Sequence, residues 1–301
     1  KYEYDLLGRP LKVYTGLCDL SETENASVLT KTYDRYGQVK TTTDALGQTA
    51  TSLYDQNGLL QERSDRNGVT ITYSYDAMGR PLAVTAPDGT TSFSYTKQGT
   101  IKLEENGDFQ ANYRYDELGR PIEIEETGGV VKSYAYNLSG NRTSFTLTKE
   151  EETLLHQSYL YDSLDRLIET KRGEETLVSY AYDSMGNRTV MTYPNGIEVH
   201  YSYNDANLLT CLETGKGEEV LLQYQYTYTL DGNRTGETDG DGRQICYDYD
   251  GQGRLQSESV GEETLSYRYD RRGNRVELKA EGTETYTVSY SYDRNNRLLT
   301  T

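Results

Sequence analysis

The sequence predicts an all-β fold made of tandem antiparallel β-hairpin repeats, and three observations lead to this prediction. A Tyr-x-Tyr-Asp-x-x-Gly-Arg/Asn pattern recurs along the 301 residues. Between its copies, apolar and polar residues alternate with a period of 2, which is the period of half-buried strands. Gly, Asn and Asp interrupt the alternation where the chain has to turn. No segment shows the 3.6-residue period of an amphipathic helix.

The copies of the pattern stay in register over the whole chain. Fourteen tyrosines precede the turn, most of them 20 or 21 residues apart: Tyr4, Tyr33, Tyr54, Tyr75, Tyr95, Tyr115, Tyr136, Tyr161, Tyr182, Tyr203, Tyr228, Tyr249, Tyr269 and Tyr292. We therefore expect residues 1–301 to form a single array of about fourteen repeats. Because the sequence starts within a repeat, we interpret it as a fragment of a longer array.

Each copy carries a turn in which Asp and Gly have separate roles. Asp at the first position and Gly at the fourth are preferred in type I turns, and Gly supplies the left-handed conformation that closes the turn. The best copies therefore define residues with a structural role: Tyr4, Asp5, Gly8, Tyr75, Asp76, Gly79, Tyr115, Asp116, Gly119, Tyr182, Asp183, Gly186, Tyr249, Asp250, Gly253, Tyr269, Asp270 and Gly273.

A second turn signal follows most of these tyrosines after 12 to 14 residues. Examples are Asn67-Gly68, Asn195-Gly196 and Asp241-Gly242, dipeptides that are typical of tight hairpins. Between the two turns of one unit, Ile71 and Tyr73 fall on one face and Thr72 on the other. Each repeat is thus predicted to consist of two strands and two turns.

Tyrosine supplies most of the large apolar surface of this chain. There are 30 Tyr, 3 Phe and no Trp, and the hydrophobic content is 34%, whereas compact domains carry roughly 45–50% apolar residues. A thin wall is therefore expected in place of a thick core. Successive Tyr-x-Tyr pairs are expected to form cross-strand ladders, and the recurring Arg after the turn glycine is expected over a neighbouring Tyr ring. A sheet of about 28 strands has to curl, which predicts a curved, spiralling sheet that is hollow or partly open.

The composition excludes several classes of function. A net charge of −17 disfavours nucleic acid, because neutralising phosphates requires clustered Lys and Arg. No run approaches the roughly 18 apolar residues of a membrane span, so no membrane insertion is expected. The three cysteines, Cys18, Cys211 and Cys246, have no metal-type spacing. The strand order predicted here separates them, and all three are expected to be free thiols.

No catalytic, cofactor-binding or metal-binding residue is predicted. Of the two histidines, His200 falls on the polar face of its strand, and the turn aspartates are accounted for by turn capping. The segment 239–242 (Asp-Gly-Asp-Gly) lacks the further ligands and terminal Glu of an EF-hand, so a hairpin turn is expected there. The chain is therefore expected not to be an enzyme and to need no cofactor.

The Tyr-x-Tyr-Asp-x-x-Gly-Arg copies resemble those of the Rhs/YD-repeat family, and the resemblance covers nearly the whole chain. That family includes bacterial Rhs toxins, wall-associated proteins, the shells of toxin complexes and the teneurins. The resemblance implies a structural shell that encapsulates or displays a C-terminal toxin or effector, with secretion or display at the surface of a bacterium. The implied partners are the remainder of the parent array and its C-terminal cargo. The conserved segment and toxin that end Rhs proteins have no counterpart after Tyr292, so no catalytic residue of the family is assigned here.

The alternative hypothesis is a repeat module that binds carbohydrate, in cell-wall or surface glycans, on rows of exposed tyrosines. Tyrosines packed against neighbouring repeats would favour the scaffold. Open grooves lined by paired rings would favour the binding module.

Overall fold

The computed structural model describes residues 1–15 and 27–301, and within them the chain forms strands and turns without a helix. The strands are β1 (Tyr2–Tyr4), β2 (Pro10–Thr15), β3 (Ser27–Tyr33), β4 (Val39–Thr43), β5 (Thr49–Tyr54), β6 (Leu60–Ser64), β7 (Thr70–Tyr75), β8 (Pro81–Ala86), β9 (Gly89–Tyr95), β10 (Ile101–Asn106), β11 (Phe109–Tyr115), β12 (Pro121–Glu126), β13 (Val130–Tyr136), β14 (Arg142–Lys149), β15 (Glu152–Tyr161), β16 (Leu167–Arg172), β17 (Glu175–Tyr182), β18 (Arg188–Thr192), β19 (Ile197–Tyr203), β20 (Leu209–Lys216), β21 (Glu219–Tyr228), β22 (Arg234–Asp239), β23 (Gln244–Tyr249), β24 (Leu255–Val260), β25 (Glu263–Tyr269), β26 (Arg275–Glu281), β27 (Tyr286–Ser289), β28 (Ser291–Tyr292) and β29 (Leu298–Thr300).

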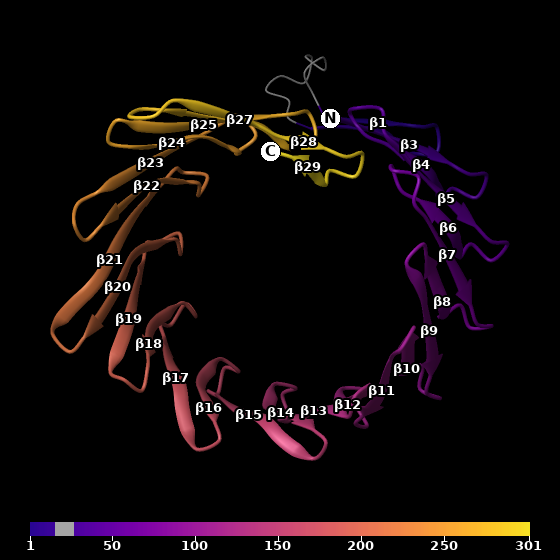
Figure 1. The fold of residues 1–301 in the computed structure, drawn as a ribbon, viewed down its shortest axis with the longest axis horizontal. Coiled ribbons are helices and arrows are strands. Elements are labelled where there is room, and N and C mark those ends of the chain that lie inside the picture. The colour runs from indigo at the N-terminus through magenta and orange to yellow at the C-terminus, as the bar shows by residue number, and fades with distance from the viewer. Residues whose placement is uncertain (16–26) are drawn as a thin grey trace. The chain divides into compact units, whose positions relative to one another are not determined.

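Strands that follow one another in the sequence pair in antiparallel fashion, as tandem hairpins require (Figure 1). Strands β1 to β27 belong to one sheet, and β28 pairs with β29 in a second. The predicted all-β fold of antiparallel hairpin repeats is confirmed.

Two compact units are present: unit 1 comprises Lys1–Thr90 and Ile245–Thr301, and unit 2 comprises Thr91–Gln244. Within unit 2 the strands follow one another along a curved path.

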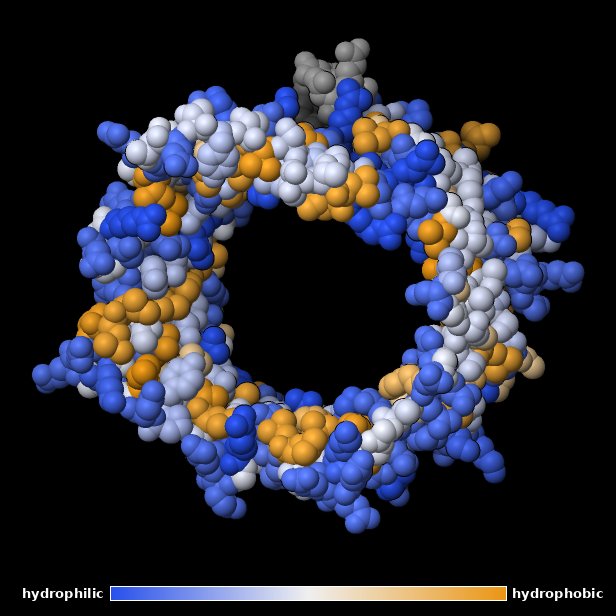
Figure 2. All heavy atoms as spheres, viewed as in Figure 1, coloured by the Kyte–Doolittle hydropathy of each residue, from blue (hydrophilic) through white to orange (hydrophobic). Residues whose placement is uncertain are grey.

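Each unit is a single layer of sheet with little interior. Among the described residues, only the apolar side chains of Ala111, Val199 and Ala280 are buried, and no large side chain is fully buried. Figure 2 shows hydrophobic residues in separate patches between hydrophilic ones. Most tyrosines are half-buried, and they pack against neighbouring strands instead of a second layer. Stability therefore has to come from contacts between adjacent repeats.

A β-bulge follows the turn in the hairpins of the repeat pattern. In the hairpin of β7 and β8, Tyr75 faces Pro81 and Ser74 faces Ala83, so Leu82 is an extra residue on the outgoing strand. The turn before it is closed by two backbone hydrogen bonds, from the Gly79 N–H to the Asp76 carbonyl oxygen (3.0 Å) and from the Asp76 N–H to the Arg80 carbonyl oxygen (2.9 Å). A bulge of this kind bends the strand and increases its twist, which suits a curved sheet.

The second turns differ from the prediction. Asn67-Gly68, Asn195-Gly196 and Asp241-Gly242 are not two-residue hairpin loops but the last half of four-residue turns with the same closure as the main turn. Gly68, for example, donates its N–H to the carbonyl oxygen of Asp65 at 3.1 Å. The reason is that these turns start three positions before the glycine, at Asp65, Tyr193 and Asp239.

Two-residue hairpin loops occur at other places in the chain. They include Pro87-Asp88, Gly107-Asp108, Glu150-Glu151, Gly173-Glu174, Gly217-Glu218 and Gly261-Glu262. In four of these loops a glycine with positive φ occupies the first position, as in a type II′ turn. Glu150 and Glu151 both have positive φ, as a type I′ turn requires.

Candidate functional site

The side chain of the turn aspartate organises its own turn. In the turn 116–119, Asp116 Oδ1 accepts hydrogen bonds from the backbone N–H groups of Leu118 and Arg120, each at 2.9 Å. Its Oδ2 accepts the Nε–H of Arg120 at 2.6 Å. The Arg120 backbone N–H is the main influence that lowers the pKa of Asp116; burial opposes it, and the Arg120 side chain and the Leu118 N–H add to the lowering. The same contacts recur at Asp5, Asp76, Asp162 and Asp250.

The arginine after the turn joins one repeat to the next. The Arg120 guanidinium carbon lies 4.7 Å from the centre of the Tyr136 ring, and its Nη1 donates to the Asn137 carbonyl oxygen at 3.2 Å. The sequence-based expectation of Arg over Tyr is confirmed here. The same stacking occurs for Arg9 with Tyr33 (4.5 Å), Arg166 with Tyr182 (4.8 Å) and Arg254 with Tyr269 (4.6 Å).

Copies that carry Gly-Asn-Arg reach the rings from the next position. Arg188 follows Asn187 and lies 4.9 Å from the Tyr201 ring and 5.6 Å from the Tyr180 ring. Arg275 makes the equivalent pair of contacts with Tyr267 and Tyr290, whereas Arg142 contacts Tyr159 and Phe145, the latter on its own strand. Both versions of the turn thus place a guanidinium on the tyrosine face between adjacent repeats, where cation–π attraction favours it.

In most repeats, the tyrosine before the turn also forms a hydrogen bond to the preceding repeat. Tyr136 donates its hydroxyl to the carbonyl oxygen of Pro121 at 2.9 Å, on the first residue of the outgoing strand. A bulge leaves backbone groups without a hydrogen-bond partner in the sheet. The tyrosine hydroxyl donates to a carbonyl oxygen of this kind. The same bond is made by Tyr33, Tyr54, Tyr75, Tyr161, Tyr182, Tyr203, Tyr228, Tyr269 and Tyr292.

The predicted cross-strand tyrosine ladder is wrong. The ring pairs found in the described residues are Tyr2–Tyr4 and Tyr113–Tyr115, each within one strand, and Tyr134–Phe145. Equivalent tyrosines of successive repeats lie two strands apart, about 10 Å, which exceeds the 4.5–7 Å of interacting rings. Arginine fills this space, so the ladder alternates tyrosine and guanidinium.

The residues expected to define the repeat occupy equivalent places in all six copies. Tyr4, Tyr75, Tyr115, Tyr182, Tyr249 and Tyr269 each end the incoming strand, and Asp5, Asp76, Asp116, Asp183, Asp250 and Asp270 each start the turn. The fourth positions, Gly8, Gly79, Gly119, Gly186, Gly253 and Gly273, have φ between 73° and 91°. This is the left-handed region, as a closing glycine requires.

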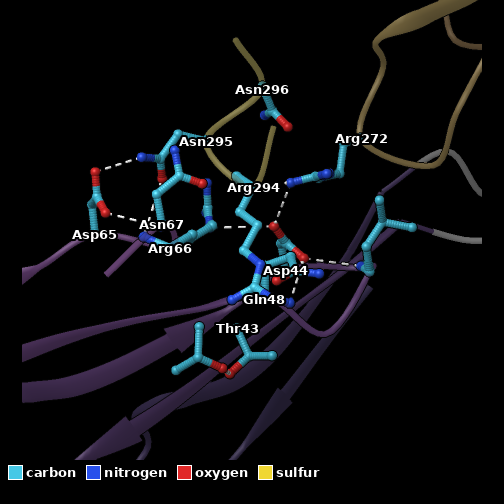
Figure 3. Close-up of polar contacts among 12 residues, drawn as sticks. Thr43, Asp44, Gln48, Asp65, Arg66, Asn67, Arg272, Arg294, Asn295 and Asn296 are labelled. Atoms are coloured by element: carbon cyan, nitrogen blue, oxygen red, sulfur yellow. Dashed lines mark hydrogen bonds and ion pairs between the residues drawn. The ribbon is translucent and has the colours of Figure 1, made fainter. Parts of the chain in front are cut away.

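A second cluster, which the sequence analysis missed, joins the two segments of unit 1 (Figure 3). We call it the terminal clasp: Asp44, Asp65, Arg66, Asn67, Arg272, Asp293 and Asn295. At its centre Asp44 Oδ2 lies 3.0 Å from Arg272 Nη1 and 3.2 Å from Arg66 Nε. The side chains of Asp44 and Arg272 are only 6% and 8% exposed. Arg66 Nε is close enough for an ion pair but lacks the alignment of a hydrogen bond.

The outer part of the clasp is a reciprocal exchange between two turns. Asn67 Nδ2 donates to Asp293 Oδ2 at 2.9 Å, and Asn295 Nδ2 donates to Asp65 Oδ2 at 2.5 Å. Burial works to raise the pKa of Asp65 and of Asp293, but hydrogen bonds outweigh it and lower both. Asp-Arg-Asn occurs at 65–67 and again at 293–295, and this repetition was the signal that could have revealed the contact.

The two histidines and Asp239, considered as candidate site residues, do not come together in a common site in the described part of the chain. His156 Nδ1 lies 2.9 Å from Thr146 Oγ1, and His200 Nε2 lies 3.2 Å from Glu198 Oε2, both on exposed strand faces. Asp239 accepts the backbone N–H groups of its own turn, so its carboxylate is engaged there. No group of three or more metal-ligating side chains occurs among residues 1–15 and 27–301, and no helix there could span a membrane.

The cysteines of the described strands are free thiols. Cys211 lies on β20 and is half-buried, while Cys246 lies on β23 and is exposed. Cys18, also predicted to be free, lies outside the described residues.

Similar proteins were found among protein families and solved structures. The RHS Repeat family matches residues 54–99, and the Teneurin YD-shell family matches residues 146–301. A crystal structure of TcdB2-TccC3-TEV is 15% identical, with a TM-score of 0.39. The Tc holotoxin pore of Photorhabdus luminescens is also 15% identical, with a TM-score of 0.41. The comparison with curated proteins gave no match.

The extent of these matches differs between the family and the structures. All of this chain aligns with each of the two toxin structures but covers only 24% of their length. The Teneurin YD-shell match, by contrast, spans just over half of the present chain. The Rhs/YD resemblance of the repeats is thereby confirmed, and the chain belongs to the teneurin YD-shell family.

Proposed function

We propose that this chain is a non-enzymatic wall segment of a shell that encloses or displays a C-terminal toxin or effector. The observation that carries the proposal is the link between repeats. A guanidinium and a phenol of one repeat bind the neighbouring repeat, as Arg120 and Tyr136 do. A single-layer sheet held in this way can be extended without a core. Membership of a family described as a YD-shell supports the same role.

The partners in this proposal are the rest of the parent array and the segment that follows it. The full sequence has a net charge of −17, which favours solubility over association with anionic lipid. A shell of this kind acts outside the producing cell, so we infer secretion or display at a bacterial surface.

Limited proteolysis of the full-length parent protein tests enclosure. We expect the segment after the array to be cleaved much more slowly in the parent than when it is produced alone. The double variant Asn67→Ala/Asn295→Ala removes both amide donors of the terminal clasp while leaving the aspartates that build the two turns. It should speed up cleavage of the enclosed segment.

The matched control is Asn57→Ala. Asn57 occupies the same third position in the turn 55–58, and only its backbone N–H is bonded there. Its replacement should leave the protection unchanged. Cleavage of the segment at equal rates in the parent and alone would contradict enclosure.

A further inference from the structure

Two neighbouring repeats of unit 1 depart from the Tyr-x-Tyr pattern. Of the fourteen tyrosines that precede the turn, twelve have another aromatic residue two positions earlier. The exceptions are Tyr33 and Tyr54, which have Lys31 and Ser52 at that position. Lys31 lies on β3 and Ser52 on β5. The tyrosine face of the sheet therefore lacks two successive rings here.

A row of side chains crosses the sheet where these rings are missing. Lys31 is paired with Thr42 on β4, and Thr42 with Ala50 on β5. Ser52 shares the face of Ala50 because strand side chains alternate, and it is paired with Arg63 on β6. Paired residues of adjacent strands lie on one face of the sheet. Three small side chains thus lie between two long cationic ones, which leaves a hollow.

A cavity of about 340 Å³ occupies this hollow. Such a volume is within the range of small-molecule sites. Arg66 and Asn295 of the terminal clasp also line the cavity, and the Arg66 N–H donates to Asn295 Oδ1 at 3.1 Å (Figure 3). Everything that forms the cavity lies within unit 1.

The charges that line the cavity are unbalanced. Its cations are Lys31, Arg63 and Arg66, and its one carboxylate is that of Asp65. The side chains of Lys31 and Arg63 have no hydrogen-bond or ion-pair partner within residues 1–15 and 27–301. Asp65, by contrast, is fully engaged, because its oxygens accept two backbone N–H groups and the amide of Asn295. Three cations against one carboxylate leave an excess of two positive charges.

The surroundings of the cavity do not remove this excess. Arg66 Nε lies 3.2 Å from Asp44, but Arg272 lies 3.0 Å from the same carboxylate and balances its charge. The hydroxyls of Thr42 and Ser52 have no side-chain partner in the described part of the chain. In a chain with a net charge of −17, the cavity therefore offers unpaired cations and free hydroxyls to an anion.

We propose that this cavity binds a small phosphate monoester. Its phosphoryl group lies between Lys31, Arg63 and Arg66, because guanidinium groups bind phosphate oxygens in a bidentate manner. The hydroxyls of Thr42 and Ser52 donate to the remaining oxygens. A phosphoryl group carries a charge of about −1.5 to −2 at pH 7, which matches the excess of two positive charges.

An ester is favoured over free phosphate because of the size and lining of the cavity. A phosphate ion fills only part of the 340 Å³, and the apolar side chains of Val39 and Ala50 also line the cavity. The organic group of the ester lies against these two side chains. This binding activity goes beyond the wall role and does not depend on it.

Calorimetric titration of the 301-residue chain with phenyl phosphate, inorganic phosphate and sulfate tests the ligand class. We expect saturable binding of phenyl phosphate that is tighter than that of inorganic phosphate and weakens as salt is added. Equal binding of the two would overturn the assignment of an ester. No saturable binding of any of the three anions would overturn the site.

The charge of the ligand is tested by repeating the titrations at about pH 7.5 and about pH 5, on either side of the second phosphate pKa of about 6. We expect phenyl phosphate to bind more weakly at the lower pH, where it is mostly a monoanion. Sulfate stays doubly charged at both values, so its binding should change little and it controls for titration of the protein. Equal binding of phenyl phosphate at both pH values would refute a site for a dianion.

Variants of the two unpaired cations test the location. Lys31→Gln and Arg63→Gln should each weaken binding of phenyl phosphate about threefold or more, as the loss of one charge pair does. Neither should lower the thermal unfolding midpoint without ligand, because neither side chain has a partner to lose. The control is Lys149→Gln, at the end of β14 in unit 2, which should leave binding unchanged. Unchanged binding in both cavity variants would place the ligand elsewhere and refute the proposal.

Discussion

The Arg120 guanidinium lies against the Tyr136 ring at 4.7 Å while its Nε donates to Asp116 at 2.6 Å. One side chain thus completes its own turn and contacts the next repeat. Because the described chain has almost no buried core, contacts of this kind hold the sheet together. Their removal should have larger effects than is usual for surface residues.

Replacing Arg120 by Gln should destabilise unit 2 by at least about 0.5–1 kcal/mol, the value of one exposed cation–π contact. The matched control is Arg114→Gln, because Arg114 is 67% exposed and only pairs with Glu123. Its effect should stay within about 0.5 kcal/mol. Equilibrium unfolding in urea measures both, and equal effects of the two changes would show that the ring contact contributes nothing.

Replacing Gly79 by Val should cost roughly 1–3 kcal/mol through backbone strain, because Gly79 has φ +78°. Space is not the cause, since an added Cβ would meet Leu59 at an ordinary 3.6 Å. Gly79→Asn should be milder, because Asn207 and Asn296 hold the same turn position with positive φ. Thermal unfolding of the three proteins would contradict this explanation if Asn and Val were equally harmful.

The turn aspartates predict a loss of stability in acid. The folded state lowers the pKa of Asp116, chiefly through the Arg120 N–H, so its contribution is present above the ordinary value of 3.8 and is lost as pH falls through the lower folded value. Asp116→Asn should therefore flatten the fall in stability below that pH, because an amide keeps the turn without titrating, as Asn137 does in its own turn. Unfolding midpoints measured across acidic pH check this; an unchanged slope would count against it.

The free thiols should differ in reactivity. Burial, followed by the charge of Glu213, raises the pKa of the Cys211 thiol, so little thiolate forms at neutral pH. Cys246 is exposed and should react faster with a thiol-specific reagent. Single-cysteine proteins made by changing the other two cysteines to Ser, followed over time, separate the rates. Faster reaction at Cys211, or a disulfide seen by mass spectrometry without reductant, would oppose the assigned strand positions.

Local features were predictable because each turn satisfies its own hydrogen bonds. Asp116 accepts the N–H groups of residues two and four positions later, so the turn depends on neighbours in sequence alone. The alternation at Ile71, Thr72 and Tyr73 likewise fixes which face of the strand each residue occupies. The second turns were assigned wrongly because Asn67-Gly68 was interpreted without the Asp65 that begins the turn.

The sequence by itself determined the strands, the turns that start at the repeat aspartates, and the number of these turns, since these follow from residues a few positions apart. Only the tertiary structure decided which further contacts join the repeats: no cross-strand tyrosine ladder forms, and the hydroxyl of a tyrosine before the turn bonds to the preceding repeat, as Tyr136 does to Pro121. It also decided the terminal clasp, in which Asp44 meets Arg272 across 228 residues. Contacts of this kind depend on the spacing and twist of many paired strands, and no short segment of the sequence encodes that geometry.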